Sequence, residues 1–369
     1  MRAVVIGAGV FGASAAYHLA LAGVEVVIVD PKLQGRATAA GAGIICPWAS
    51  AVEEPGHYAL STAGARYYPQ LIDRLAQDGE TDTSYRRVGA MIVCADAAEM
   101  DQAERRTRAR AEQAPEAGSI DRISAREAQA LFPPLRDGQD AIHISGGARV
   151  DGRKLAAALA RAAERHGATR EDGAATLVVG AGKVRGVAIA DRVIEADQVV
   201  VAAGAWAPAL LAPLGLSLAV EPQRGQIVHL RSAGTDTSRW PVLLPMSNHY
   251  LLAFDDSRVV VGATRETGSG FDYKVTAGGL AQVLEAALSV APGLATFEHL
   301  ETRIGFRPMG PGLTPLLGRI PGLDGLVIGN GLGAGGLTMG PNAGRLLAEI
   351  ALGHDTGIDL SPYDPLRRA

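Results

Sequence analysis

This chain has very few cysteines, few aromatic residues and no long apolar run. Cys46 and Cys94 are the only two cysteines in 369 residues, too few for a disulfide framework or a cysteine-rich metal site. We therefore expect a reducing, cytoplasmic location and no metal centre. Aromatic residues make up 5% of the chain, and no basic stripe is interleaved with them, which argues against nucleic acid as a partner. Apolar runs are short or interrupted, so the sequence predicts no membrane-spanning segment.

Glycine, by contrast, is abundant. The chain has 46 glycines, 47% hydrophobic residues and a formal net charge of -4. This composition is typical of a close-packed α/β protein rather than a disordered one. The length allows two domains, each with its own core.

The first thirty residues carry the most specific pattern. An apolar run, Arg2 to Ile6, leads into the glycine turn Gly7 to Gly12 and an alanine-rich stretch, Ala13 to Leu21. A second apolar run, Val24 to Val29, ends at Asp30. Strand, glycine turn, helix, strand and acid in this order predict a dinucleotide-binding βαβ unit. The alternative is a βαβ unit without a ligand.

Each part of this unit has a physical role. Gly7 permits the tight turn, Gly9 lets the backbone approach a pyrophosphate, and Gly12 lets the helix pack close to the strand. The helix start attracts phosphates through its unpaired N–H groups. Asp30 is placed to accept hydrogen bonds from a ribose 2′-hydroxyl and disfavours a 2′-phosphate, so the ligand is FAD or NAD rather than NADP. Further cofactor contacts are expected from Val10, Phe11 and Pro31.

The rest of the chain alternates between two kinds of segment. Residues 1–51, 146–219 and 301–369 are expected to form one Rossmann-type α/β domain from pieces separated in sequence. Residues 52–145 and 220–300 are rich in strands with a few helices. They are expected to form a second, α+β substrate domain built on a mostly antiparallel sheet. The last helix is predicted from Pro341 to Leu352.

Six blocks in the same order resemble the D-amino-acid oxidase family of FAD-dependent oxidoreductases, especially glycine oxidases and D-amino-acid dehydrogenases. The first is the glycine turn with Asp30. The others are the segments 38–43, 199–208 with 222–226, 261–266 with 276–279, 305–318, and 331–341. The resemblance implies a discontinuous FAD-binding domain of the GR2 type and oxidation of an amino acid.

The resemblance also implies which segments hold the flavin. The small-residue loop after the second strand and the glycine-rich turn before the last helix are expected to contact the ring. Backbone N–H groups of that turn would stabilise negative charge on the N1–C2=O edge of a reduced flavin. For the first loop a plain turn is the alternative, and Gly204 could simply end a strand. The implied contacts are Thr38, Ala39, Ala40, Gly41, Gly43, Ile44, Thr176, Ala203, Gly204, Trp206, Gly333, Ala334, Gly335, Gly336, Leu337 and Thr338.

Four residues are implied at the substrate. Arg307 matches the family's arginine that holds the substrate carboxylate, and it would lie beside the cofactor as well; a guanidinium suits this role because its fork binds both oxygens. Tyr250 falls where glycine oxidases have a tyrosine that closes on the carboxylate. Trp48 and Asn248 are expected in the pocket. The alternatives are an ion-paired arginine, an ordinary strand tyrosine and a core tryptophan.

The chain also departs from the family pattern. Glycine oxidases have an arginine where this chain has Ala334, and Gly310 and Gly312 replace the usual Thr and Asp after Arg-Pro-Met. The change at position 334 predicts a roomier, more apolar pocket and favours a bulkier D-amino acid, or a cyclic or N-alkyl amino acid, over glycine. The two glycines could reflect a site that a partner chain completes. No cysteine lies near Met309 to bind flavin covalently, so FAD is expected to be non-covalent.

The expected reaction is oxidation of the amino acid to an imine by hydride transfer to flavin N5, followed by hydrolysis to the oxo acid. In this family the cofactor carries the chemistry while the protein supplies position and electrostatics. Alternatives are a 2-hydroxy-acid dehydrogenase and a flavin subunit of a heteromeric amine dehydrogenase, with an NAD-dependent enzyme less favoured. The electron acceptor is oxygen or a quinone, and an oligomer is possible.

Overall fold

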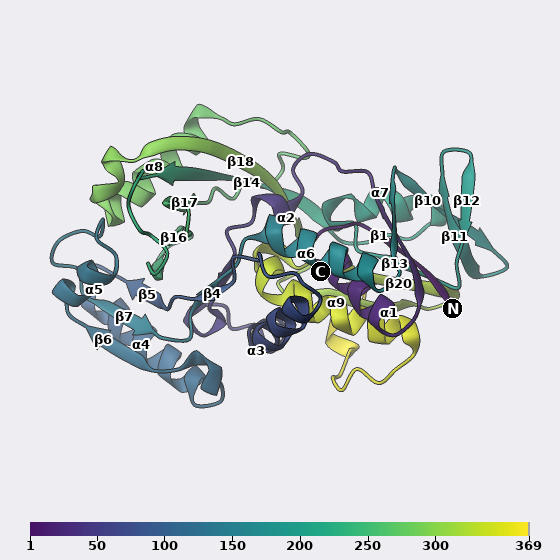
Figure 1. Ribbon diagram of the computed structural model, residues 1–369, viewed down its shortest axis with the longest axis horizontal. Coiled ribbons are helices and arrows are strands. Elements are labelled where there is room, and N and C mark those ends of the chain that lie inside the picture. The colour runs from purple at the N-terminus through teal and green to yellow at the C-terminus, as the bar shows by residue number, and fades with distance from the viewer. Residues whose placement is uncertain (368–369) are drawn as a thin grey trace.

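The computed structural model describes residues 1–367, and two large sheets dominate it (Figure 1). One sheet has nine strands and includes the first strand of the chain, and the other has eight. Helices cover the region between them, as Figure 1 shows for α1, α6 and α9. The expected combination of a Rossmann-type domain with a mostly antiparallel second sheet is confirmed.

The nine-stranded sheet has a parallel centre. β1 pairs in parallel with both β2 and β13, and β20 and β9 extend the sheet on either side. Val4, Val5 and their neighbours are fully buried, which explains why these strands read as continuous apolar runs. The strands are β1 (Arg2–Ile6), β2 (Glu25–Asp30), β9 (Thr169–Asp172), β10 (Ala175–Gly180), β11 (Lys183–Ile189), β12 (Arg192–Glu195), β13 (Gln198–Val201), β19 (Leu316–Ile320) and β20 (Leu323–Asn330).

Helix α1 is buried on nearly all sides because α6 and α9 pack against it. Its small residues permit this close packing: a Cβ at Gly344 of α9 would lie 2.6 Å from the Phe11 carbonyl oxygen. α3 packs on α9 and α6, although we expected residues 52–145 in the second domain. These helices are α1 (Val10–Leu21), α3 (Pro55–Gln77), α6 (Gly152–Arg165) and α9 (Gly336–Leu352).

The eight-stranded sheet is antiparallel apart from one parallel pair, β15 with β5. Helix α8 covers strands β14 and β17, while α4 lies on β5 and β6. The strands are β5 (Ala90–Val93), β6 (Ile120–Ile123), β7 (Ala141–Ile144), β14 (Glu221–Arg231), β15 (Val242–Pro245), β16 (Tyr250–Ala253), β17 (Arg258–Gly262) and β18 (Glu298–Met309). The helices are α4 (Ala97–Ala111), α5 (Ala125–Leu131) and α8 (Ala277–Val290).

Short elements connect the two large sheets. A small antiparallel sheet joins β3 (Ile44–Ile45), β4 (Arg86–Arg87) and β8 (Ala148–Arg149). Two short helices are α2 (Ala37–Ala40) and α7 (Ala207–Leu211). The 3-10 turns are η1 (Pro47–Ala49), η2 (Pro115–Ala117), η3 (Gly204–Trp206), η4 (Ala212–Leu214), η5 (Pro292–Thr296), η6 (Gly333–Gly335) and η7 (Ser361–Tyr363).

Two sequence expectations differ from this fold. The boundary expected at residue 301 falls inside β18, which pairs with β14 along its length and so belongs to the second sheet. The last helix begins at Gly336 rather than Pro341. Pro341 has no N–H for the Leu337 carbonyl, but the Tyr68 hydroxyl donates a hydrogen bond to that oxygen instead. Within residues 1–367, no helix has the length and apolarity to span a membrane, and no acid, histidine and cysteine cluster could hold a metal ion.

Candidate active site

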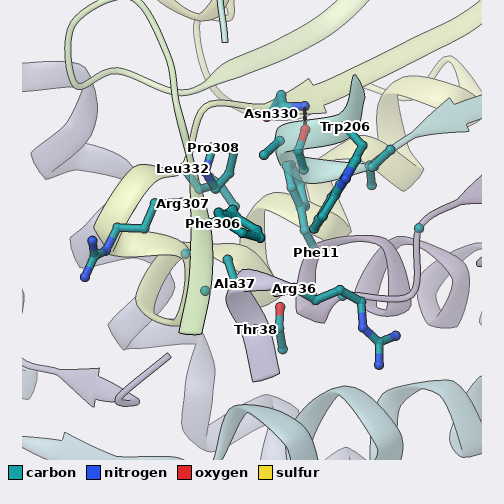
Figure 2. Close-up of a pocket in the computed structure, with 18 of the residues that line it drawn as sticks. Phe11, Arg36, Ala37, Thr38, Trp206, Phe306, Arg307, Pro308, Asn330 and Leu332 are labelled. Atoms are coloured by element: carbon teal, nitrogen blue, oxygen red, sulfur yellow. Dashed lines mark hydrogen bonds between the residues drawn. The ribbon is translucent and has the colours of Figure 1, made fainter. Parts of the chain in front are cut away.

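A cavity of about 630 Å³ opens at the carboxyl ends of the parallel strands. Its wall includes Gly7 after β1, Asp30 at the end of β2, Ala203 after β13 and Asn330 at the end of β20. This is where open α/β sheets bind ligands, and the volume suits a cofactor. In Figure 2, Arg36 and Arg307 lie on opposite sides of the labelled residues, which indicates the extent of the site.

Asp30 is held rigidly at one end of the cavity. Its Oδ2 accepts a hydrogen bond of 2.6 Å from the Ala8 N–H, and its Oδ1 accepts one of 2.6 Å from the Lys32 N–H. The Arg36 guanidinium lies 3.4 Å from Oδ1. Carboxylate oxygens have further acceptor capacity, so Asp30 can still bind a ribose hydroxyl. Its neighbours in the glycine turn also line the cavity: Gly7, Gly9, Val10, Phe11 and Pro31.

Gly12 does not line the cavity, and its role is in packing α1 against β1. A Cβ at Gly12 would lie 2.0 Å from the Gly7 carbonyl oxygen, so only glycine lets α1 begin so close to β1.

The small-residue loop forms one wall. The Thr38 hydroxyl accepts a hydrogen bond of 3.1 Å from the Val10 N–H and so caps the start of α1. Gly43 has a φ of 93°, and a Cβ there would lie 1.7 Å from the Val150 carbonyl oxygen. Ala39 lies outside the cavity lining, where its carbonyl accepts a hydrogen bond from Arg153. The predicted residues of this loop that line the cavity are Thr38, Ala40, Gly41, Gly43 and Ile44.

Asn330 links two turns in the opposite wall of the cavity. Its Nδ2 donates to the Gly204 carbonyl at 2.9 Å (Figure 2), and its Oδ1 accepts from the Gly331 N–H at 2.8 Å. The two turns that end β13 and β20 are therefore held side by side. Apart from the adjoining residues of the chain, no atom of residues 1–367 lies within 4 Å of a Cβ built at Gly204, and the position lines the cavity. The predicted residues of this wall are Thr176, Ala203, Gly204, Trp206, Gly333, Ala334, Gly336 and Leu337.

Aromatic side chains close the wall near Trp206. The Trp206 ring stacks on Phe271 with centroids 5.0 Å apart and meets Phe306 edge-on at 6.1 Å. Such pairs are a favourable aromatic geometry. They give a planar ligand an apolar surface along this side.

Arg307 and Tyr250 come together at the other end of the cavity. The Arg307 Nη1 donates to the Thr264 carbonyl at 3.0 Å and to the Gln223 Oε1 at 3.3 Å. Burial lowers the pKa of Arg307; the Tyr250 hydroxyl opposes this, and the Arg265 charge adds to it. Burial also raises the pKa of Tyr250, which keeps its hydroxyl protonated as a donor. A desolvated guanidinium with neutral partners favours an incoming carboxylate.

Two glycines make room for this pair. A Cβ at Gly225 would lie 2.6 Å from the Arg307 Nη2, and a Cβ at Gly262 would lie 2.7 Å from the Tyr250 hydroxyl oxygen. The strands β14 and β17 thus lack side chains where the functional groups lie. Close approach of this kind is a common reason for glycine inside a strand.

The remaining predicted residues lie in different places. Asn248 lines the main cavity. Gly335 and Thr338 line a second, adjoining cavity of about 250 Å³, and the Thr338 hydroxyl donates to the Ile44 carbonyl at 2.8 Å. Trp48 lines neither cavity; it is 2% exposed within the main core, because η1 turns its ring inward.

Sequence reasoning missed several residues that line these cavities. Four polar examples are Arg36, Gln223, Arg265 and Asn330. Asn330 could have been found from its place at the end of a strand directly before a glycine turn. Arg265 lay within a block already used for the resemblance, but neither its spacing nor its neighbours indicated that it faces a cavity.

The residues present fit an FAD molecule. Asp30 suits the ribose, and the unpaired N–H groups at the starts of α1 and α9 suit the negatively charged parts of the ligand. The small residues from Thr38 to Ile44 and from Gly333 to Leu337 leave space for a flat ring between them. No predicted contact needs a metal or a covalent link.

Comparisons with known proteins agree with this geometry. A family model described as FAD dependent oxidoreductase, the DAO family, matches residues 2–350. The crystal structure of an iminodiacetate oxidase from Chelativorans sp. BNC1 is 54% identical, with a TM-score of 0.97 and 99% of each chain covered. A glycine oxidase from Pseudomonas aeruginosa is 35% identical, covering 100% of this chain and 99% of its own. The glycine oxidase structure from Geobacillus kaustophilus is 25% identical, with a TM-score of 0.87, covering 100% of this chain and 99% of that one.

Proposed function

The chain belongs to the DAO family of FAD-dependent oxidoreductases, and from this premise we propose that it oxidises an N-substituted amino acid at the bond between nitrogen and its α-carbon. Members of the family are flavoproteins that act on amino-acid-like substrates, so the chain is an oxidoreductase with FAD as its cofactor. The finer assignment concerns the amine and the residues that hold it.

The observation that carries this proposal is the Arg307 guanidinium. It lines the cavity, and its hydrogen-bond acceptors are the Thr264 carbonyl and the Gln223 amide oxygen rather than a carboxylate. Its positive charge is therefore available to a substrate acid. A bidentate contact with Arg307, supplemented by the Tyr250 hydroxyl, would fix the orientation of the α-carbon.

The chain's part in the reaction is to position the substrate. When bound, FAD accepts a hydride equivalent from the α-carbon. Among the described residues that line the main cavity, Asp30 is the only carboxylate, and it is held at the far end by Ala8 and Lys32. The acid that acts on Arg307 is Glu266, and its oxygens already accept hydrogen bonds from Arg224, Gln226 and Thr264. We therefore expect the substrate amine to bind in its neutral form. The resulting imine is hydrolysed by water.

Two relatives support a substituted amine. The similar iminodiacetate oxidase is named for a secondary amine, whereas the glycine oxidases are named for a primary one. Ala334 lines both cavities, and its side chain is a single methyl group. This space would accommodate a substituent on nitrogen.

An anaerobic titration tests the proposal. The purified holoenzyme is mixed with sarcosine, iminodiacetate, D-alanine, D-proline, glycine and glycolate, and bleaching of the flavin absorbance is recorded. We expect bleaching by at least one secondary amine and weaker bleaching by glycine. The variant Arg307→Met should retain FAD but require far higher amine concentrations. Bleaching by glycolate alone would establish a hydroxy-acid dehydrogenase instead, and bleaching by none of these compounds would refute amine oxidation.

A further inference from the structure

Two neutral acceptors orient the Arg307 guanidinium. Its Nη1 donates to the Thr264 carbonyl at 3.0 Å and to the Gln223 Oε1 at 3.3 Å. Thr264 follows β17 and is fully buried, whereas Gln223 lies in β14. Because neither acceptor carries a charge, the position of the guanidinium depends on how firmly these two groups are held.

The Glu266 carboxylate holds the Thr264 side chain. The Glu266 Oε1 accepts a hydrogen bond of 2.6 Å from the Thr264 hydroxyl, which itself accepts one of 2.9 Å from the Gln226 N–H. The main chain of Glu266 is also fixed, since its N–H donates to the Arg224 carbonyl at 2.9 Å and its carbonyl accepts from the Arg224 N–H at 3.1 Å. The peptide that carries the Thr264 carbonyl is therefore held by contacts before and after it.

Two buried side chains of β14 hold Glu266 in turn. Arg224 donates to the Glu266 Oε2 through Nε at 3.0 Å and Nη2 at 2.5 Å, and the Gln226 Nε2 donates to Oε1 at 2.7 Å. Gln226 also reaches helix α8, because its Oε1 accepts from the Thr276 N–H at 2.9 Å. Arg224, Gln226 and Glu266 line neither cavity. The network thus lies behind the wall that carries Arg307.

Glu266 remains charged within this network. Burial alone would raise the pKa of its carboxyl, but hydrogen bonds from Gln226, Thr264 and Arg224 outweigh burial and hold the pKa below its usual value. Burial lowers the pKa of Arg307, and the Glu266 charge is among the effects that oppose this. Both Glu266 oxygens are already occupied by donors, so the carboxylate supports the charged guanidinium without blocking it.

We infer that Glu266 is a positioning residue for the substrate anchor and that it acts on Arg307 through the hydroxyl and carbonyl of Thr264. This inference rests on the proposed function, in which Arg307 holds the substrate acid. Without the Glu266 carboxylate, the Thr264 carbonyl and the guanidinium are free to shift together. A small displacement of a group that orients the substrate lowers both its binding and its rate of reaction.

Binding of methoxyacetate to the holoenzyme tests the anchor without oxidation. This compound has a carboxylate but no amine, and its binding is followed by the change in flavin absorbance. Glu266→Gln keeps the size of the side chain but has one oxygen in place of two, so it cannot accept from Arg224 and Thr264 together. We expect its dissociation constant for methoxyacetate to rise about 10-fold.

Variants of Thr264 break the same link from the other side. Thr264→Val removes the hydroxyl at nearly constant volume and should also raise the dissociation constant about 10-fold. Thr264→Ser retains the hydroxyl and should stay within about 2-fold of the wild type. The matched control is Glu301→Gln, because Glu301 pairs with Arg303 at 2.5 Å on β18 and lines neither cavity. It should bind methoxyacetate as the wild type does.

A double-variant cycle shows whether the effect passes through Arg307. The second-order rate constant for flavin reduction by sarcosine is measured by stopped flow in the wild type, Glu266→Gln, Arg307→Met and the double variant. Glu266→Gln should lower this constant about 10-fold when Arg307 is present but less than about 2-fold in Arg307→Met, because the group that it positions is already gone.

The outcomes separate this inference from the proposed function. Equal losses in the two backgrounds would show that Glu266 serves the fold in general and would overturn its role. Unchanged binding of methoxyacetate in Glu266→Gln, or release of FAD from both Glu266→Gln and Thr264→Val, would overturn it as well. Failure of every amine to reduce the wild-type flavin would instead refute the proposed function, and methoxyacetate binding would still decide the role of Glu266.

Discussion

Replacing Gly225 with alanine should displace Arg307 while leaving the fold intact. The new Cβ would lie 2.6 Å from Nη2 and 2.7 Å from Cζ of Arg307. Ordinary contacts between carbon atoms are about 3.5–4.0 Å, so the guanidinium must move by about 1 Å. The obstructed group is the end of a flexible side chain, which can move at little cost to the backbone. The contacts of Arg307 with Thr264 and Gln223 would be lost or lengthened.

The expected effect is on catalysis rather than stability. A shift of about 1 Å in a positioning group can cost about 100-fold in rate, so we expect kcat/KM to fall by about that factor. Gly225 has an ordinary extended φ, and an alanine compatible with the backbone changes stability by less than about 1 kcal/mol. The assay is stopped-flow reduction of the flavin by iminodiacetate and sarcosine, with thermal unfolding of the same samples.

Gly278→Ala is the matched control. Nothing lies within 4 Å of a Cβ at Gly278, which is exposed in helix α8. This change should leave the reduction rate unaltered and add about 0.5–1 kcal/mol to stability. Full activity of Gly225→Ala would refute the reasoning that the position of Arg307 limits the reaction. Loss of FAD or a large drop in Tm would show instead that Gly225 serves the fold.

Three further perturbations have defined outcomes. Asp30→Ala removes the acceptor of the Ala8 and Lys32 N–H groups, and each lost charge-assisted bond costs about 1.5–3 kcal/mol. The FAD dissociation constant, measured by quenching of flavin fluorescence, should rise at least about 10-fold. An unchanged dissociation constant would contradict the role of Asp30. Gly43→Ala would place a Cβ 1.7 Å from a backbone oxygen of Val150, so soluble yield and Tm should both fall, which a normal melting curve would disprove. Burial holds the pKa of His18 at about 4 in the folded state, below its unfolded value of about 6.5, so the unfolded chain binds more protons between these values and stability is lost as the pH falls through this window. The loss between pH 7 and pH 5 should be about 2 kcal/mol by urea unfolding and should shrink in His18→Gln; identical pH profiles would exclude this contribution.

The sequence was most informative where backbone geometry dictates residue type. Gly7 and Gly12 permit a close strand and helix, and no other residue type fits them, so the glycine turn predicted the β1–α1–β2 unit directly. The start of α9 could not be found in this way. Pro341 normally marks a helix start, but here it lies inside the helix, and the Tyr68 hydroxyl, distant in sequence, donates to the Leu337 carbonyl that Pro341 leaves without a partner.

The substrate end of the site was harder to predict because its residues come from separate strands. Arg307 was identified through the family resemblance, whereas Arg265 was not, since its exposure to a cavity depends on the pairing of β14, β17 and β18. Trp48 illustrates the opposite error of inference. It lies close in sequence to the small-residue loop, yet η1 directs its ring into the core, and no local pattern distinguishes these directions.

Two adjacent residues of strand β18 contact the expected flavin-binding loop region and the second sheet. The Phe306 N–H donates to the Gly35 carbonyl at 2.8 Å, directly before the loop expected against the ring. The next residue, Arg307, donates to the carbonyl of Thr264, which follows β17 of the second sheet. A single peptide unit therefore sets the separation between cofactor and substrate anchor. An insertion or deletion of one residue at this point would turn the following side chains to the other face of the strand, and we expect it to abolish turnover.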